Sequence, residues 1–264
     1  MAGPELRQSI QAMGLEFPTV LGVAAGFDPR GHLGKGASAL GFGFNEIGSL
    51  DAASLPDRLP LNLQGSALLG INLRLDPGRS DQALCQGLAR AWPHADYLML
   101  NLIGPGSEVL LDRRERPRLC HLLSELRRKR SELEQTTARH VPLAVKVRSL
   151  PGQIPLALAQ MLLELGYDGL LAAHDPGPPA TRQRYLDWQN PAHQEQACRQ
   201  IEALHRLCAK DMALMSVGGI QTREHLQARL SAGAELVQIH TALLHQGPGI
   251  AGDLLNQSRI VRVI

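Results

Sequence analysis

The sequence predicts a single (β/α)₈ barrel (a TIM barrel), one domain spanning residues 1–264. Short apolar runs alternate with longer helix-patterned stretches, which is typical of βαβ units around a parallel sheet. Eight such runs can be counted, and 264 residues suit one barrel. No G-x-G-x-x-G segment follows the first run, which argues against an open dinucleotide-binding sheet.

Eight strands are expected from these runs. Several are apolar throughout instead of alternating, as strands covered on both faces should be. In chain order they are Val20–Ala24, Phe44–Gly48, Leu68–Asn72, Tyr97–Asn101, Leu143–Val147, Gly169–Ala173, Ala213–Val217 and Leu236–Ile239.

Helical patterns lie between the strands. Three of them are followed by a glycine (Gly41, Gly166 and Gly233), where a left-handed residue would end the helix. Two other stretches, Asp51–Ser66 and Asp175–Pro191, are expected to be loops, and loops of such length are usually functional or disordered. The expected helices are Gly34–Leu40, Asp81–Trp92, Pro117–Arg139, Pro155–Leu165, His193–Ala209 and Thr222–Ala232.

Composition excludes several classes of function. Lysine and arginine number 27 against 25 aspartates and glutamates, which gives no argument for nucleic acid or an anionic membrane surface. The arginines of Asp112–Arg130 alternate with acidic residues, as on the solvated face of an amphipathic helix. No signal peptide or membrane span is recognisable, and no C-x-x-C pair suggests a metal site. We therefore expect reduced cysteines, no metal and a cytoplasmic location.

Chemistry in such barrels is built just past the carboxyl ends of the strands. The residues at those positions are polar or glycine where a core would be apolar. They are Gly26, Asp28, Ser49, Asn72, Asn101, Lys146, His174, Gly218, Gly219, His240 and Thr241.

Lys146 is the most informative of these residues, because it interrupts an apolar strand. A buried ammonium is costly unless an anion or a strong acceptor meets it. One partner would be the electron-rich edge of a reduced flavin, and the other would be a barrel carboxylate such as Glu46. The pair Gly218-Gly219, between a strand and a helix, would let backbone N–H groups approach a phosphate.

Ordered segments along nearly the whole chain resemble dihydroorotate dehydrogenases, particularly the quinone-linked class. The resemblance lies in Gly22-Val23-Ala24-Ala25-Gly26-Phe27-Asp28, Ala39 to Ser49, Leu69-Gly70-Ile71-Asn72, Ala95 to Asn101, Val145-Lys146, Val217-Gly218-Gly219-Ile220, Ala232-Gly233-Ala234, Val237-Gln238 with Thr241, and Gly247-Pro248-Gly249-Ile250.

This resemblance implies the barrel fold, an FMN cofactor and a small-molecule substrate. Carried over by position, Ala24, Ala25 and Gly26 would contact the flavin through their backbone. The flavin ring and its ribityl chain would be held by Ser49, Asn72, Asn101 and Lys146, and the phosphate by Gly218, Gly219, His240 and Thr241.

The substrate half of the family's site is missing. Gly104 stands where these enzymes have the serine that takes the substrate proton, and Gly106 replaces a substrate-binding asparagine. A general base typically contributes about 10²–10⁴-fold, so dihydroorotate oxidation is not expected.

Two interpretations follow from this loss. The first is a flavin oxidoreductase with another substrate, whose acid–base group is His174 or, after it, Asp28 or Asp175. An imidazole titrates near neutral pH, although a loop histidine bound to backbone is an equal alternative for His174. The second is a degenerate relative that serves as a binding or partner subunit, in a homodimer or a heteromeric complex.

Overall fold

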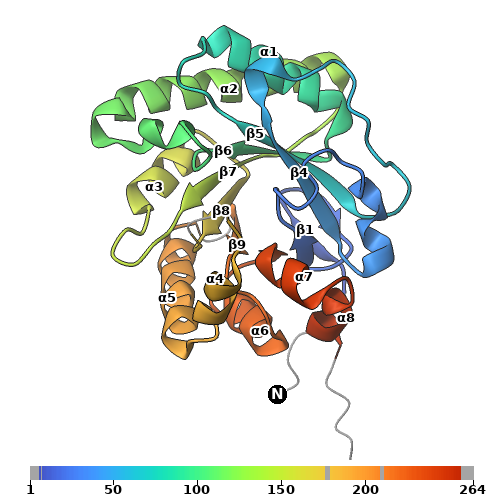
Figure 1. Cartoon of the computed structure of the whole chain (residues 1–264). Helices are drawn as coiled ribbons and strands as arrows, with labels where there is room; N and C mark the ends of the chain where they lie inside the picture. The colour runs from blue at the N-terminus through green and yellow to red at the C-terminus, as the bar shows by residue number, and fades with distance from the viewer. Residues whose placement is uncertain (1–5, 7, 176–178, 209–210, 257–264) are drawn as a thin grey trace, which may run out of the picture.

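A closed parallel barrel forms the centre of the molecule, as Figure 1 shows for the computed structural model. The structure describes residues 6, 8–175, 179–208 and 211–256. Around the barrel the strands follow chain order, and the last pairs with the first. The predicted barrel is confirmed. Its strands are β3 (Leu21–Val23), β4 (Phe44–Asp51), β5 (Leu68–Arg74), β6 (Tyr97–Asn101), β7 (Leu143–Arg148), β8 (Gly169–Ala173), β9 (Ala213–Val217) and β10 (Leu236–Ile239).

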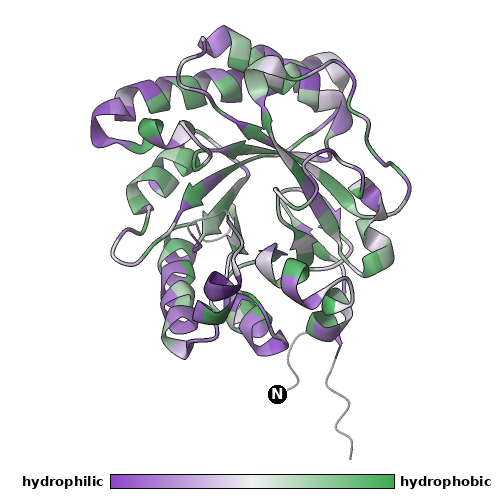
Figure 2. Ribbon diagram, in the orientation of Figure 1, coloured by the Kyte–Doolittle hydropathy of each residue, from purple (hydrophilic) through white to green (hydrophobic). Residues whose placement is uncertain are grey.

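Helices surround the strands, with apolar residues turned inward and polar ones outward (Figure 2). Gly41, Gly166 and Gly233 all have positive φ, so the predicted left-handed ends are confirmed. The helix predicted over Gly34–Leu40 has these bounds in the structure and is a 3₁₀ helix, η1. The α-helices are α1 (Asp81–Ala91), α2 (Arg116–Thr137), α3 (Leu156–Glu164), α4 (Arg182–Asp187), α5 (Pro191–Cys208), α6 (Arg223–Ser231), α7 (Thr241–Gln246) and α8 (Ile250–Leu255).

Short 3₁₀ turns complete the described chain. The carboxylate of Asp51 caps the turn that follows β4 by accepting from the Ala53 N–H at 2.9 Å. These turns are η2 (Ala52–Ser54), η3 (Trp92–His94), η4 (Ser107–Leu111) and η5 (Arg113–Glu115).

A hairpin that the sequence analysis missed closes the amino-terminal end of the barrel. Its strands, β1 (Ile10–Ala12) and β2 (Leu15–Phe17), are three residues each, too short to show a clear period. The turn residues Met13 and Gly14 both have positive φ, as in two-residue hairpins. Phe17 packs edge-on against the Phe44 ring at 5.3 Å between centroids, so the hairpin forms an aromatic floor.

Glycines in two strands make room for large side chains on the next strand. Gly22 of β3 is paired with Phe44 of β4, and a Cβ at Gly22 would overlap the Phe44 ring. Gly70 of β5 is likewise paired with Tyr97 of β6, and a Cβ there would overlap the Tyr97 ring. The lower barrel is therefore filled by a few large rings beside glycines, at the close packing typical of protein interiors.

The stretch Asp175–Pro191, expected to be a loop, contains the helix α4, so that expectation was wrong in part. The Thr181 hydroxyl caps α4 by accepting from the Arg184 N–H at 3.3 Å. Residues 176–178 of this stretch, and Ala209 of the helix expected up to that position, lie outside the described residues. The stretch Asp175–Pro191, which forms an insertion between β8 and α5, brings Tyr185 and Trp188 to the carboxyl end of the barrel.

Three negative findings apply to the described part of the chain. None of its helices is both long and apolar enough to cross a bilayer. Its histidines, cysteines and acids form no group of three or more that could hold a metal ion. The four cysteines are free thiols, and Cys85 and Cys208 are buried.

Candidate functional site

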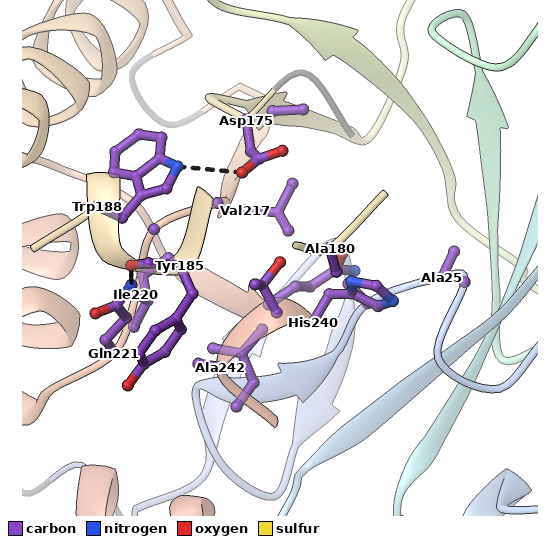
Figure 3. A pocket seen from close by; sticks show the side chains of 18 of the residues that line it. Ala25, Asp175, Ala180, Tyr185, Trp188, Val217, Ile220, Gln221, His240 and Ala242 are labelled. Carbon is purple, nitrogen blue, oxygen red and sulfur yellow. Dashed lines mark hydrogen bonds between the residues drawn. The ribbon is translucent and has the colours of Figure 1, made fainter. Parts of the chain in front are cut away.

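A cavity of about 210 Å³ opens at the carboxyl ends of the strands (Figure 3). Lys146 and the segment after β6 line one end, and the insertion covers the other. Nine of the candidate site residues predicted from the sequence border it: Ala24, Ala25, Gly26, Lys146, Asp175, Gly218, Gly219, His240 and Thr241.

Lys146, on β7, supplies a half-buried cation to this cavity. The nearby carboxylates of Glu46 and Asp175 raise the pKa of its amine, but burial is the larger effect and lowers it overall. No hydrogen bond or ion pair of this amine is found among the described residues, so the barrel leaves it open to a ligand. The assignment of Lys146 to a flavin stays a prediction.

Glu46, the alternative partner for Lys146, accepts hydrogen bonds from three neutral donors instead. Its two carboxylate oxygens accept from Asn72 Nδ2 at 2.7 Å, Tyr97 OH at 3.2 Å and Gln238 Nε2 at 2.7 Å. Glu46 therefore acts on Lys146 through its charge and not through a direct ion pair. The same bonds fix Gln238, whose Oε1 is buried with no partner among the described residues.

Asn72, Asn101 and Ser49 form a hydrogen-bonded chain beside the cavity. Asn101 Nδ2 donates to Ser49 Oγ at 2.8 Å and to Asn72 Oδ1 at 3.1 Å, and Asn72 continues the chain to Glu46. None of the three is among the residues that line the cavity. Their assignment as flavin contacts stays a prediction, and the contact that they make here is with one another.

The loop after β3 forms the opposite wall of the cavity. Gly26 adopts φ +101°, where L side chains are rare, and its N–H donates to the Gly48 carbonyl at 2.7 Å. His240 lies against Gly26 and points into the space shown in Figure 3. Burial and the neighbouring Lys146 charge lower the pKa of His240, so its imidazole is neutral near pH 7.

The two glycines after β9 border the cavity, and each lies against another residue of the chain. A Cβ on Gly218 would lie 2.9 Å from the backbone nitrogen of Asp175 and 3.0 Å from its Cβ. A Cβ on Gly219 would overlap the Trp188 ring. Trp188 Nε1 donates to Asp175 Oδ2 at 3.1 Å, which joins the two flanking residues.

His174 lies in a different cavity, between β8 and the helices α4 and α5. Its Nδ1 is 2.7 Å from Gln200 Oε1, and its Nε2 is buried with no partner among the described residues. Burial and the Arg229 charge lower the pKa of His174 to about 3. Such an imidazole stays neutral and does not border the Lys146 cavity, so the geometry gives its predicted acid–base role no support.

Asp28 has a structural environment. Its carboxylate accepts from the Gly34 N–H at 2.9 Å and from Asn45 Nδ2 at 2.8 Å, which ties the loop after β3 to η1 and β4. It does not border the cavity. Of the three predicted acid–base residues, only Asp175 does, and it lies at the Gly218–Gly219 end.

The position of the missing serine is filled by a neighbouring side chain. A Cβ on Gly104 would lie 3.2 Å from Cγ and Cδ of Arg74. Arg74 continues from β5 and pairs with Asp51 at 3.6 Å. The cavity wall here is Ile103, so this end of the cavity offers a hydrocarbon surface beside the Lys146 amine.

Sequence reasoning gave no role to several residues that border the cavity. Gln238 had a detectable signal, because it is a polar residue inside an apolar strand, as Lys146 is. Tyr185 and Trp188 had none, since their approach to the barrel depends on how the insertion folds back. Tyr185 is held by the Gln221 amide, which donates to its carbonyl at 2.5 Å.

The comparison with curated proteins decides the family. Dihydroorotate dehydrogenase (quinone) of Bordetella avium is 30% identical over 295 residues, covering 95% of this chain and 84% of that protein. The chain belongs to the dihydroorotate dehydrogenase (quinone) family. The Thiobacillus denitrificans member is 27% identical, with 94% of this chain and 86% of that protein covered.

Solved structures agree in fold with this assignment. Dihydroorotate dehydrogenase from Eimeria tenella, in complex with ferulenol, superposes with a TM-score of 0.72 at 21% identity, over 96% of this chain and 83% of that one. Its ligand-free form gives a TM-score of 0.70 at 22% identity. A scan against models of protein families found no match for this chain. The dihydroorotate dehydrogenases are flavin-dependent oxidoreductases, which makes a flavin the group against which to test the site.

The two ends of the cavity fit a flavin differently. The Lys146 amine and the Gln238 side chain, whose Oε1 has no partner among the described residues, both border the cavity, and a heterocycle with acceptors and donors could use both. At the Gly218–Gly219 end, Asp175 lies beside Gly218 and Trp188 beside Gly219, so a carboxylate residue and an indole flank the backbone that borders the cavity. The volume of about 210 Å³ is below the roughly 300–1,000 Å³ usual for small-molecule sites.

Proposed function

We propose that this chain, as one barrel domain over 1–264, is an FMN-binding oxidoreductase that acts on a small molecule other than dihydroorotate. The observation that carries the proposal is the half-buried Lys146 amine, which borders a cavity in a chain of the dihydroorotate dehydrogenase family. FMN, when bound, supplies a ring that accepts two electrons and a proton from the substrate.

The residues around Lys146 would orient that ring. The Lys146 amine would donate to the electron-rich edge of the heterocycle, and Gln238 Oε1 would accept from a ring N–H. Glu46 keeps Gln238 in place through the 2.7 Å bond to its Nε2. The backbone of Ala24, Ala25 and Gly26 would form the opposite wall.

The substrate side supports a changed reaction. From Asn101 to Gly106 the chain carries no side chain that takes up a proton near neutral pH, and Arg74 lies against Gly104. A dihydroorotate molecule would therefore lose the proton acceptor that its oxidation requires. Asp175 borders the cavity and is the remaining acid–base candidate of the three.

The alternative is a partner or binding subunit that has lost catalysis. The observation in its favour is the covered Gly218–Gly219 corner together with the small cavity volume. Such a subunit would keep the barrel and contribute a surface to a homodimer or a heteromeric complex.

The test is the visible spectrum of the purified protein, with mass identification of whatever is released on denaturation. We expect an oxidised-flavin spectrum that dihydroorotate leaves unchanged. Lys146→Ala should weaken flavin binding by about 10–100-fold, because a bond from a charged donor contributes about 1.5–3 kcal/mol. Lys129→Ala, on α2 and outside the cavity lining, is the matched control and should retain the wild-type affinity.

Three outcomes would contradict the proposal. Rapid bleaching by dihydroorotate would overturn the changed substrate. A folded protein that takes up no added flavin would overturn the cofactor and favour the subunit alternative. Equal flavin affinity in Lys146→Ala and the wild type would remove the assigned role of the lysine.

A further inference from the structure

One cation and one carboxylate border the cavity among the described residues, and they are close enough to interact through their charges. Lys146 is the only lysine or arginine among the described residues that border it, and it lies at the inner end. Asp175, at the outer end, lies against Gly218, where a Cβ would be 3.0 Å from its own Cβ. His240, the other titratable group of the lining, has a lowered pKa and adds no positive charge near pH 7.

Trp188 is held firmly over Gly219. Its indole N–H is bonded to Asp175, and its backbone carbonyl accepts from Gln194 Nε2 at 2.8 Å. The same Gln194 amide donates to the Gly219 carbonyl at 2.6 Å, so one side chain joins the covering residue to the covered loop. The His193 ring packs edge-on against the indole at 5.9 Å.

The arginines near this corner are turned to other partners. The Arg229 guanidinium lies 6.0 Å from the Trp188 ring centre and donates to the Gln194 carbonyl and side chain, both at 3.0 Å. Arg184 borders the second cavity and donates to the Pro179 carbonyl at 3.1 Å. A phosphate at Gly218–Gly219 would therefore meet a carboxylate and an indole before any cation.

We infer that Asp175 and Trp188 determine ligand specificity by excluding a phosphate from the Gly218–Gly219 corner, so that the cavity gains nothing from the phosphate of FMN. The inference rests on the proposed flavin site and specifies its ligand class. That class is a flavin held by its ring near Lys146, either riboflavin or FMN, with the phosphate of FMN outside the corner. Backbone N–H groups at such glycines favour anions only where no like charge stands beside them.

Titrations with two flavins test this inference, because riboflavin carries the same ring without the phosphate. Quenching of flavin fluorescence gives the dissociation constant of each, at low and constant ionic strength. Wild-type protein should bind riboflavin at least as tightly as FMN. Asp175→Asn should tighten FMN by about tenfold or more, since like charges about 4 Å apart repel strongly at a protein surface, and should leave riboflavin unchanged.

Two further variants distinguish the effect of the Asp175 charge from the steric effect of the Trp188 ring. Trp188→Ala uncovers Gly219 and should also tighten FMN relative to riboflavin. Asp187→Asn makes the same charge change on the neighbouring helix α4, away from the cavity, and should alter neither affinity. Far-UV circular dichroism of each variant confirms that the barrel is intact.

The outcomes distinguish this inference from the proposed function. Tighter binding of FMN than riboflavin by the wild type, or an equal change for both flavins in Asp175→Asn, would overturn the exclusion of phosphate alone. Absence of binding of either flavin to the wild type and to every variant would overturn the flavin site and the inference together. A preference for riboflavin that reverses in Asp175→Asn would support both.

Discussion

The inner and outer ends of the cavity are built in different ways. At the inner end, Lys146 and Gln238 project from barrel strands whose register is fixed by pairing on both sides. At the outer end, Asp175 and Trp188 come from the insertion that contains α4. The strands leave polar groups open toward the cavity, whereas the insertion fills the approach with its own side chains.

This difference implies that the barrel strands and the insertion are subject to different structural constraints. A strand residue cannot turn to the other face without a change of register, so the pairing of β7 and β10 constrains the directions of Lys146 and Gln238. A connecting segment can change length and course at little cost, and specificity therefore changes there first. Membership of the family then informs the inner end of this cavity better than the outer one.

Among the variants considered, removal of the Arg229 side chain should change the free energy of unfolding most. The buried guanidinium donates to the backbone and side chain of Gln194 and to Cys198, and Gln194 in turn holds Trp188 and Gly219. We expect Arg229→Ala to lower the free energy of unfolding by about 3 kcal/mol, as for the loss of a buried charged donor and its packing. Urea denaturation followed by circular dichroism measures this.

The same variant tests the independence of the two ends. Riboflavin affinity should stay within about threefold of wild type if only the outer end loosens. Arg199→Ala, on the exposed side of α5, is the matched control and should change stability by less than about 0.5 kcal/mol. A collapse of riboflavin binding in Arg229→Ala would show that the two ends are one cooperative unit.

The barrel was predictable because its signal is repeated and local. Apolar runs and terminal glycines located all eight strands, and β6, β8, β9 and β10 match the expected bounds. The hairpin β1–β2 was missed because strands of three residues carry too little pattern. The insertion resists prediction for another reason: the place of Trp188 depends on bonds to Asp175 and Gln194, which no local pattern encodes.

The candidate site was predictable where strands carry it. Lys146 interrupts an apolar strand, and it does border the cavity. The position of His174 at the end of β8 gave no indication of its direction, and the structure turns it to the second cavity. Sequence position fixes which end of a strand a residue occupies, but packing around the following loop decides which way its side chain points.

The free energy of unfolding should depend on pH through His174, a buried residue outside the flavin cavity. Its pKa of about 3 in the folded protein is below the ordinary value of 6.5 in the unfolded chain. The unfolded state therefore binds the extra proton, and the stabilising contribution is complete above pH 6.5 and is lost as pH falls toward 3.

The size of this acid effect can be isolated with a variant. Between pH 7 and pH 5, the wild type should lose about 2 kcal/mol more stability than His174→Asn, whose amide does not titrate. His193→Asn, an exposed histidine of α5, should behave like the wild type. Equal pH dependence in the wild type and His174→Asn would mean that the imidazole is protonated in the folded protein.

The smallest effect is expected from restoring a hydroxyl at the inner end. Gly104→Ser places its Cβ 3.2 Å from the aliphatic part of Arg74, a flexible neighbour, so stability should change by less than about 1 kcal/mol. Stopped-flow absorbance should still show no bleaching of bound flavin by dihydroorotate, since Gly106 and the insertion remain. Reduction by dihydroorotate in this variant would mean that one side chain separates the two reactions.

The ring–glycine pairs of the barrel floor constrain how this sequence can evolve. Gly22 accommodates Phe44, and Gly70 accommodates Tyr97, each across one strand pair. A side chain gained at either glycine, with the ring retained, would create overlap, and a smaller residue in place of the ring would leave a void. Each pair can therefore diverge only through concerted changes, and descendants of this barrel should keep both partners or exchange both.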